Sequence, residues 1–207
     1  MIPRLYPIVD AGVLAGRGVA LEDVARELRA ADVGLVQYRD KAGSPQEVLR
    51  AAAVLRKAMM GGECRLIMND RADLAVLAGF DGVHVGQGDL SPEDARRVVG
   101  VGRQVGVSTN TEEQARAAEL SSADYVAIGP VFATGTKANA EQVVGLEGVR
   151  RARALTLKPL VAIGGITRAN ARSVIDAGAD SVAVISALFA EGESVERVAR
   201  DFLELLR

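Results

Sequence analysis

The chain has 207 residues, with 25 Lys and Arg against 27 Asp and Glu, one His, one Cys and no Trp. A net charge of −2 and only 3% aromatic residues exclude the basic surface and stacking platforms typical of nucleic-acid binders. One Cys and one His exclude an intrachain disulfide and a structural zinc site. The length predicts one globular domain over residues 1–207.

Neither the first residues nor the apolar runs indicate a membrane protein. The first residues, MIPRL, lack the basic and apolar regions of a signal peptide. The longest apolar run, at 182–190, is too short to cross a bilayer. We therefore expect a soluble cytoplasmic protein with no membrane or nucleic-acid partner, while formation of a homo-oligomer stays open.

Short apolar runs typical of buried parallel strands alternate with longer amphipathic segments along the whole chain. The amphipathic segments open with helix-capping residues, as in Ser44-Pro45, Ser91-Pro92, Thr111, Thr167 and Ser194. Eight such units predict an α/β fold, the (β/α)8 TIM barrel, with a doubly wound open sheet as the alternative. The expected strands are 5–9, 34–38, 65–68, 82–85, 104–107, 125–129, 159–163 and 181–185.

Charged and amide side chains follow the second, third and fourth expected strands. Gln37, Arg39 and Lys41 alternate onto one side, while Tyr38 and Asp40 alternate onto the other. An amide with two cations suits an anionic ligand that carries a polar ring, and a solvated loop is the competing interpretation.

Two carboxylates follow the third and fourth expected strands. Asp70 comes after Asn69 and the third strand, and Asp89 comes after the fourth. Neighbouring strands lie about 4.8 Å apart, so the two carboxylates can reach one cation, and two Asp without His or Cys favour Mg²⁺. Capping of the next helix by Asn69 or Asp70 is the simpler interpretation.

The last four expected strands end in small and hydroxyl residues. Ser108 ends the fifth strand, a long segment with two Thr, a Gly and Lys137 follows the sixth, and Gly164-Gly165 follows the seventh. The loops after the seventh and eighth strands form the recurrent phosphate site of this barrel. One cationic and one neutral anion site together indicate a metal-assisted transfer between two phosphorylated small molecules.

Several remaining polar residues have simpler structural interpretations. His84 lies inside the fourth strand, where a hydrogen-bonded barrel residue is expected rather than a general base. Cys64, Asp81 and Asp124 precede strands and therefore lie at the end of the barrel away from the site.

Motifs over the whole chain, in order, resemble the thiamine-phosphate synthase family. The motifs are LYPIV at 5–9, QYRDK at 37–41, NDR at 69–71, DGVHVGQGD at 81–89, GVST at 106–109, GPVFATGTK at 129–137 and AIGGI at 162–166. The resemblance implies one catalytic TIM-barrel domain. It also implies a transferase that joins 4-amino-2-methyl-5-hydroxymethylpyrimidine diphosphate to 4-methyl-5-(2-phosphoethyl)-thiazole, or its carboxylated form, with release of pyrophosphate.

The resemblance also implies the site residues. The pyrimidine diphosphate would be bound by Gln37, Arg39, Lys41, Asn69, Ser108 and Lys137, of which Arg39, Lys41, Ser108 and Lys137 are expected to be catalytic. The expected substrate-binding set further includes Tyr38 and Asp40, then Thr134, Gly135 and Thr136 for the thiazole substrate, and Gly165, Ile185 and Ser186 for its phosphate. Asp70 and Asp89 would hold the cofactor Mg²⁺.

Three positions depart from the family pattern. Asn110 stands where many members have His, and Tyr38 and Asp40 stand where Leu and Glu are common.

A thiazole tautomerase paralogue is a competing function, although it relies on a His at the position of Asn110 and typically lacks the full set of Mg²⁺-binding and diphosphate-binding residues. A sugar-phosphate epimerase and a non-catalytic regulator that binds thiamine precursors also compete with the synthase.

Overall fold

The computed structural model describes residues 2–134 and 142–207. In this part of the chain eight parallel strands pair in chain order, and the last pairs with the first to close a barrel. The predicted (β/α)8 barrel is confirmed, and the open sheet is excluded because the barrel has no edge strand. The strands are β1 (Leu5–Asp10), β2 (Leu35–Arg39), β3 (Arg65–Asn69), β4 (Gly82–Val85), β5 (Gln104–Thr109), β6 (Tyr125–Ile128), β7 (Leu160–Ile163) and β8 (Ser181–Val184).

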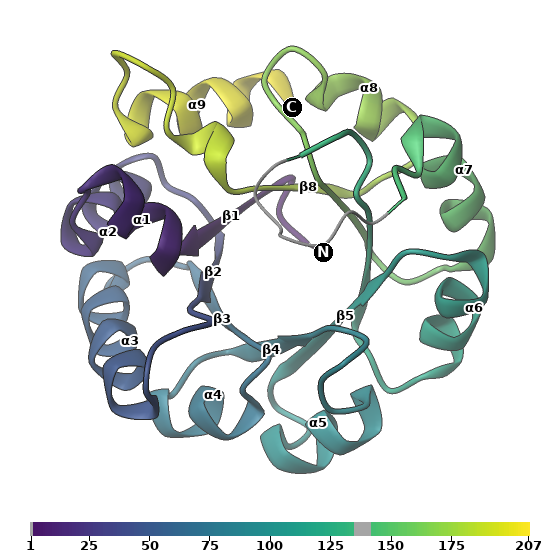
Figure 1. Cartoon of the computed structure of the whole chain (residues 1–207), viewed down its shortest axis with the longest axis horizontal. Helices are drawn as coiled ribbons and strands as arrows, with labels where there is room; N and C mark the ends of the chain where they lie inside the picture. The colour runs from purple at the N-terminus through teal and green to yellow at the C-terminus, as the bar shows by residue number, and fades with distance from the viewer. Residues whose placement is uncertain (1, 135–141) are drawn as a thin grey trace.

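The helices surround the barrel, as the view down its axis shows (Figure 1). The expected caps Ser44, Ser91, Thr111 and Ser194 each accept a backbone hydrogen bond at a helix start. The helices are α1 (Ala11–Arg17), α2 (Leu21–Ala30), α3 (Pro45–Met59), α4 (Ala72–Ala78), α5 (Pro92–Val99), α6 (Glu112–Leu120), α7 (Gly145–Leu155), α8 (Ala171–Asp176) and α9 (Val195–Leu205), with a 3₁₀ turn at Ser186–Leu188.

Two helices differ from the expectation. A short helix, α1, follows β1 directly, because the Asp10 carboxylate accepts the Val13 N–H at 2.9 Å and caps it. The helix expected from Thr167 begins instead at Ala171. The reason is a turn ahead of α8, in which the Asn170 side chain accepts the Thr167 N–H at 2.8 Å.

Three aspartates link neighbouring strands by hydrogen bonds at the end of the barrel where the strands begin. Asp81, Asp124 and Asp180 precede β4, β6 and β8, and each accepts a backbone N–H from near the start of the preceding strand. These N–H groups belong to Leu66, Val105 and Leu160, at 2.7 to 2.8 Å. The structural role expected for Asp81 and Asp124 is therefore confirmed.

The hydrophobic core has two parts, one inside the barrel and one between the barrel and its helices. The inner part includes Tyr6, Ile67 and Tyr125. Gly106 of β5 makes room for it, because a Cβ there would lie 2.0 Å from Tyr125 Cζ and 2.5 Å from His84 Nδ1. Strands buried on both faces explain why the sequence shows apolar runs instead of alternation.

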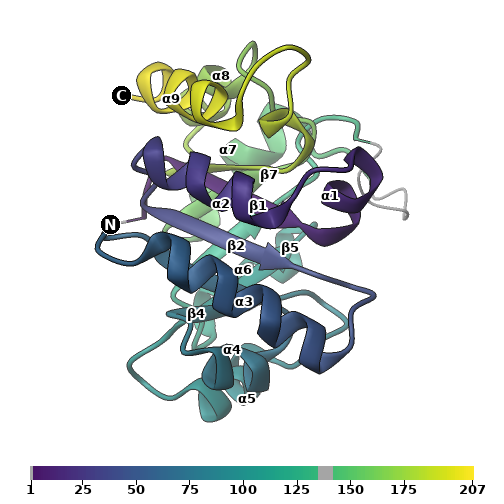
Figure 2. The ribbon, with the colours of Figure 1, turned by 90° about the vertical axis from the view of Figure 1, so that its left-hand side faces the viewer.

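All strands point toward the end of the barrel that carries α1, as the side view shows for β2 (Figure 2). The residues that follow the strands therefore share this end, which we call the mouth. Among the described residues, no helix has the length and apolar character needed to span a membrane.

The chain has three tyrosines, and burial raises the pKa of each phenol above its ordinary value. The reference pKa of a tyrosine in an unfolded chain is about 10. Above that pH the folded state therefore binds more protons than the unfolded state, and the free energy of unfolding falls as pH rises. We expect Tyr6, Tyr38 and Tyr125 to ionise together, in a step that coincides with unfolding.

A titration to alkaline pH tests this expectation. Tyrosinate absorbance reports ionisation without interference from tryptophan, which the chain lacks. Circular dichroism reports the fold in the same samples. The burial described above would be contradicted if all three phenols ionised near their reference pKa of about 10 while the fold stayed intact.

Candidate functional site

The end of β2 places two cationic side chains at the mouth. Arg39 forms an ion pair with Asp10 at the end of β1, and the Asp10 side chain is only 7% exposed. The second carboxylate oxygen of Asp10 caps α1. The Asp10 carboxylate, itself fixed by its bond to α1, thus holds the Arg39 guanidinium group in place. Asp10 was not recognised from the sequence, although a charged residue that ends an apolar strand is a usable signal.

Lys41 lies beyond β2 and forms an ion pair with Asp70. Its side chain is 54% exposed, whereas that of Asp70 is 17% exposed. The predicted alternation is also confirmed, because Tyr38 packs in the layer between barrel and helices. The Asp40 carboxylate accepts the N–H groups of Ala42 and Gly43 at 3.1 and 2.8 Å and the Tyr38 hydroxyl at 3.3 Å, so it shapes the loop after β2.

Asp70 and Asp89 come close together at the ends of β3 and β4. Burial raises the pKa of Asp70, the ion pair with Lys41 lowers it, and the neighbouring Asp89 carboxyl raises it. Asp70 has a left-handed backbone, with φ of 60°, and its N–H donates to the His84 carbonyl at 2.7 Å. Asp89 accepts the Gly86 N–H at 2.9 Å. The two carboxyl groups are thus close neighbours.

This pair fits a hard divalent cation. Carboxylate oxygens are the ligands that Mg²⁺ takes in ones and twos, with its other positions filled by water and phosphate oxygens. In the described part of the chain, no group of three or more His, Cys, Asp and Glu side chains gathers to make a closed site. Two oxygen donors on the same side of the mouth as Arg39 and Lys41 therefore suit a cation that a phosphate also binds.

The Asn69 side chain carries a buried hydrogen-bond donor next to Asp70. Its Nδ2 is buried and has no hydrogen-bond partner among the described residues. A buried donor without a partner costs about 1–3 kcal/mol, so a ligand oxygen there is favourable. Asn69 ends β3 next to Asp70, which places this donor at the Lys41–Asp70 cluster.

Ser108 near the end of β5 is held by His84 of β4 and by Gln87, which follows β4. His84 Nε2 lies 2.8 Å from Ser108 Oγ, and Gln87 Nε2 donates to the Ser108 carbonyl at 2.6 Å. The prediction that His84 is a hydrogen-bonded barrel residue is confirmed. Both ring nitrogens are engaged, since Nδ1 lies 3.0 Å from the Tyr125 hydroxyl.

A second part of the mouth lies at the ends of β6, β7 and β8. Thr134, Gly165 and Ser186 line a cleft of about 750 Å³ together with α1. Gly164 and Gly165 have φ values of 100° and 63°, and a Cβ on Gly165 would lie 2.6 Å from the Ala133 carbonyl. The glycine pair thus serves close packing as well as the cleft. Ile185 lies directly before the 3₁₀ turn that begins with Ser186.

Arg17 of α1 also lines this cleft, which the sequence predicted as a neutral site. Its guanidinium lies 5.2 Å from the ring centroid of Phe189 and donates to the Phe189 carbonyl at 3.3 Å. Sequence reasoning missed Arg17 because nothing near it marks α1 as part of the mouth. The expected residues Gly135, Thr136 and Lys137 lie outside the described residues.

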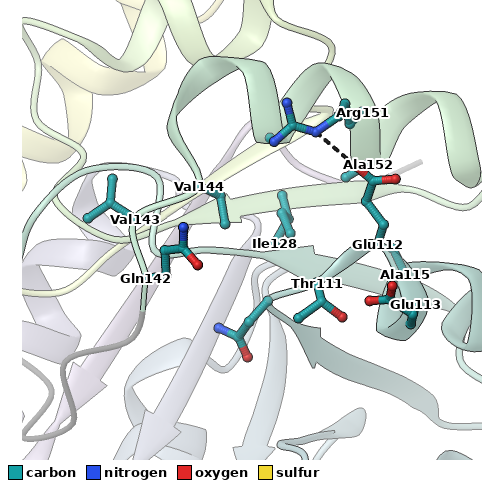
Figure 3. Close-up of a pocket in the computed structure, with 12 residues that line it drawn as sticks. Thr111, Glu112, Glu113, Ala115, Ile128, Gln142, Val143, Val144, Arg151 and Ala152 are labelled. Carbon is teal, nitrogen blue, oxygen red and sulfur yellow. Dashed lines mark ion pairs between the residues drawn. The ribbon is translucent and has the colours of Figure 1, made fainter.

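Asn110 borders a different pocket, of about 460 Å³, between α6 and α7 (Figure 3). Its Nδ2 donates to the Gly129 carbonyl at 2.6 Å. Figure 3 shows the ion pair between Arg151 of α7 and Glu112 of α6, two of the residues that line this pocket. The two charged groups lie 2.9 Å apart. The Asn110 amide thus ties β5 to the segment after β6, and an amide cannot serve as a general base.

Cations, an amide donor and paired carboxylates at the carboxyl ends of the strands define an enzyme of the (β/α)8-barrel class. The model of the family described as thiamine monophosphate synthase matches residues 5–188. The chain therefore belongs to the thiamine monophosphate synthase family, and its relatives are transferases. The family expected from the motifs is confirmed.

Individual relatives agree with the family model. A thiamine-phosphate synthase of Koribacter versatilis is 54% identical over 99% of this chain and 96% of its own. One of Methanoculleus marisnigri is 44% identical over 91% and 89%. The solved thiamine phosphate pyrophosphorylase of Pyrococcus furiosus superimposes with a TM-score of 0.87 at 30% identity, over 98% of this chain and 95% of that one.

Proposed function

We propose that this chain joins 4-amino-2-methyl-5-hydroxymethylpyrimidine diphosphate to 4-methyl-5-(2-phosphoethyl)-thiazole or its carboxylated form. The products are thiamine monophosphate and pyrophosphate. Besides family membership, the observation that carries the proposal is the cluster at the ends of β2 to β4. There Lys41 pairs with Asp70, the Asp89 carboxyl lies beside Asp70, and Asn69, the residue before Asp70, has a buried Nδ2 that has no hydrogen-bond partner among the described residues. Such a cluster suits a diphosphate better than a single phosphate or a neutral ligand.

The diphosphate would be bound by Arg39, Lys41 and Asn69, with Lys137 as a further expected cation. Gln37 would face the pyrimidine ring, since its buried side chain lies two residues before Arg39 on the inward side of β2. Fixed donors around a leaving group stabilise the charge that develops when the bond to carbon breaks. Asp10 contributes by holding the Arg39 guanidinium in place.

Asp70 and Asp89 would hold Mg²⁺, which neutralises diphosphate charge when bound. The transfer itself needs no nucleophilic side chain. The bond between the pyrimidine methylene carbon and the diphosphate oxygen breaks, and the oxygen keeps the electron pair. The thiazole nitrogen then donates its lone pair to the methylene cation and forms the new C–N bond. The protein's task is therefore to bind the leaving group and to orient the acceptor.

Thr134, Gly165, Ile185 and Ser186 would bind the thiazole phosphate in the cleft near α1. Three of them line this cleft directly. Backbone N–H groups near a helical turn and hydroxyl side chains are common phosphate ligands. Both substrates carry phosphate and cross membranes poorly, so a reaction in the cytoplasm is consistent with this chemistry.

Replacing Thr134 by Ala tests the assignment of the cleft. We expect KM for the thiazole phosphate to rise about tenfold, because a hydrogen bond to a charged group contributes about 1.5 kcal/mol. The KM for the pyrimidine diphosphate and the melting temperature should not change, since Thr134 is exposed. Steady-state kinetics with each substrate varied in turn measures both values. An unchanged KM for the thiazole phosphate would remove Thr134 from the site.

Removal of divalent cations tests the carboxylate pair. Treatment with EDTA should abolish pyrophosphate release, and added Mg²⁺ should restore it. Circular dichroism of the EDTA-treated protein serves as the control, because loss of the cation should leave the barrel folded. Full activity in EDTA would show that Asp70 and Asp89 do not act through a metal ion.

A further inference from the structure

A continuous row of hydrogen bonds, which we call the interior relay, crosses the inside of the barrel. It joins Gln37 of β2 to Ser108 of β5. Gln37 Nε2 donates to the Tyr6 hydroxyl at 3.0 Å, and the Tyr6 and Tyr125 hydroxyls lie 2.9 Å apart. Tyr125 continues to His84 Nδ1 at 3.0 Å, and His84 Nε2 continues to Ser108 Oγ at 2.8 Å. At one end of these hydrogen bonds lies Gln37, which is proposed to face the pyrimidine ring, and at the other lies Ser108, which the family resemblance implies as a ligand of the same substrate.

The three middle residues of the interior relay, Tyr6, Tyr125 and His84, are shielded from water. Tyr6 and Tyr125 are each 1% exposed, and His84 is 8% exposed. The rings of His84 and Tyr125 stack with centroids 5.5 Å apart, and the two tyrosine rings meet edge to face. In such a place each polar hydrogen needs an acceptor within the protein. This requirement decides in which direction the hydrogens point.

The Gln37 amide can only donate through Nε2, so Tyr6 accepts this bond. The hydrogen of Tyr6 then has one acceptor in the described structure, the Tyr125 oxygen. Tyr125 in turn donates to His84 Nδ1, which leaves the imidazole hydrogen on Nε2, where it is donated to Ser108 Oγ. In the opposite direction, the Tyr6 oxygen would accept twice and its own hydrogen would have no acceptor.

We propose that Tyr125 is a positioning residue. It fixes His84 as the Nε2–H tautomer, so that Ser108 accepts from His84 and directs its own hydroxyl hydrogen into the mouth as a donor for the pyrimidine diphosphate. This proposal rests on the proposed function for the identity of the ligand. The tautomer and the direction of the hydrogens depend only on the structure of the barrel interior.

Without the Tyr125 hydroxyl, the direction at Ser108 can reverse. Tyr125 then no longer donates a hydrogen bond to His84 Nδ1, so the imidazole hydrogen can move from Nε2 to Nδ1. Nε2 becomes an acceptor, and Ser108 donates to it instead of to the ligand. The Tyr125→Phe variant therefore loses a donor in the mouth while every side chain that touches the ligand is still present.

Nitrogen NMR of the imidazole tests the tautomer directly. The chain contains one histidine, so the imidazole signals of uniformly ¹⁵N-labelled protein belong to His84 alone. We expect a protonated Nε2 and an unprotonated Nδ1 at neutral pH, without any ligand. In Tyr125→Phe we expect this pattern to be lost. A protonated Nδ1 with an unprotonated Nε2 in the unchanged protein would overturn the proposal.

Tyr6→Phe is the matched control. It removes a second buried phenol hydroxyl from the same interior but keeps the bonds from Tyr125 to His84 and from His84 to Ser108. We expect the His84 signals of Tyr6→Phe to match those of the unchanged protein. Equal changes in both variants would show that general loosening of the interior, and not the Tyr125 bond, decides the tautomer.

Kinetics then separates positioning from a merely structural role. In Tyr125→Phe we expect kcat/KM for the pyrimidine diphosphate to fall about tenfold, the effect of about 1.4 kcal/mol, while KM for the thiazole phosphate changes less than about twofold. A lower melting temperature with equal effects on both substrates would overturn the proposal. If the unchanged protein makes no product but shows the expected tautomer, the proposed function fails while the assignment of the interior hydrogens is upheld.

Discussion

Replacement of Asp70 by Asn lowers kcat by about two orders of magnitude in our account, the size typical for loss of one fixed charge-stabilising group. The amide retains the shape of the side chain but is a poor ligand for Mg²⁺. It also ends the ion pair with Lys41. Steady-state measurement of pyrophosphate release, at saturating concentrations of both substrates, gives kcat directly.

The same variant should fold as well as the unchanged protein. Asp70 has a φ of 60°, a backbone conformation that Asn adopts as readily as Asp. Removal of one of two neighbouring carboxylates also relieves repulsion with Asp89 when no cation is bound. Asp70→Ala is the informative contrast, because Ala in this conformation costs about 1 kcal/mol of backbone strain. Unfolding of Asp70→Asn at a much lower temperature would show a structural role instead of a catalytic one.

Replacement of Lys41 by Ala should also lower kcat about a hundredfold, since a cation at the leaving diphosphate is lost. Its stability effect should be small, because Lys41 is 54% exposed and exposed ion pairs contribute about 0–1 kcal/mol. Thermal unfolding and kinetics of the same preparation separate the two effects.

Lys57→Ala provides the control for Lys41→Ala. Lys57 is an exposed lysine in the last turn of α3. It carries the same charge but lies at the end of the helix away from the mouth. We expect its kcat to stay within about twofold of the unchanged protein, as for a typical exposed surface position. Similar losses in Lys41→Ala and Lys57→Ala would point to net charge and not to a diphosphate contact.

The barrel could be predicted from the sequence because its signals are local. Each strand is an apolar run, and caps such as Ser44 and Thr111 mark where helices begin. The count of eight units favoured closure, which the pairing of β8 with β1 confirms. The short helix α1 was missed because its cap, Asp10, also ends a strand and looks like part of it.

The candidate site was predictable as far as strand ends reveal it. Lys41, Asn69 and Asp70 could be placed at the mouth because each follows a strand of a parallel sheet. Contacts between distant strands could not be predicted. The bond between Tyr6 and Tyr125 joins residues 119 positions apart, and neither apolar run shows that its tyrosine faces the other across the barrel. Arg17 was missed because nothing near it in the sequence marks α1 as part of the mouth.

The most direct test of the account is to quantify pyrophosphate and thiamine monophosphate together, with Mg²⁺ and both substrates, using the unchanged protein. We predict that the two products appear in equal amounts, and that neither forms when one substrate or Mg²⁺ is left out. If both substrates bind and no thiamine monophosphate forms, the chain is a binding protein for these precursors, and the account of its mouth as a catalytic site is wrong.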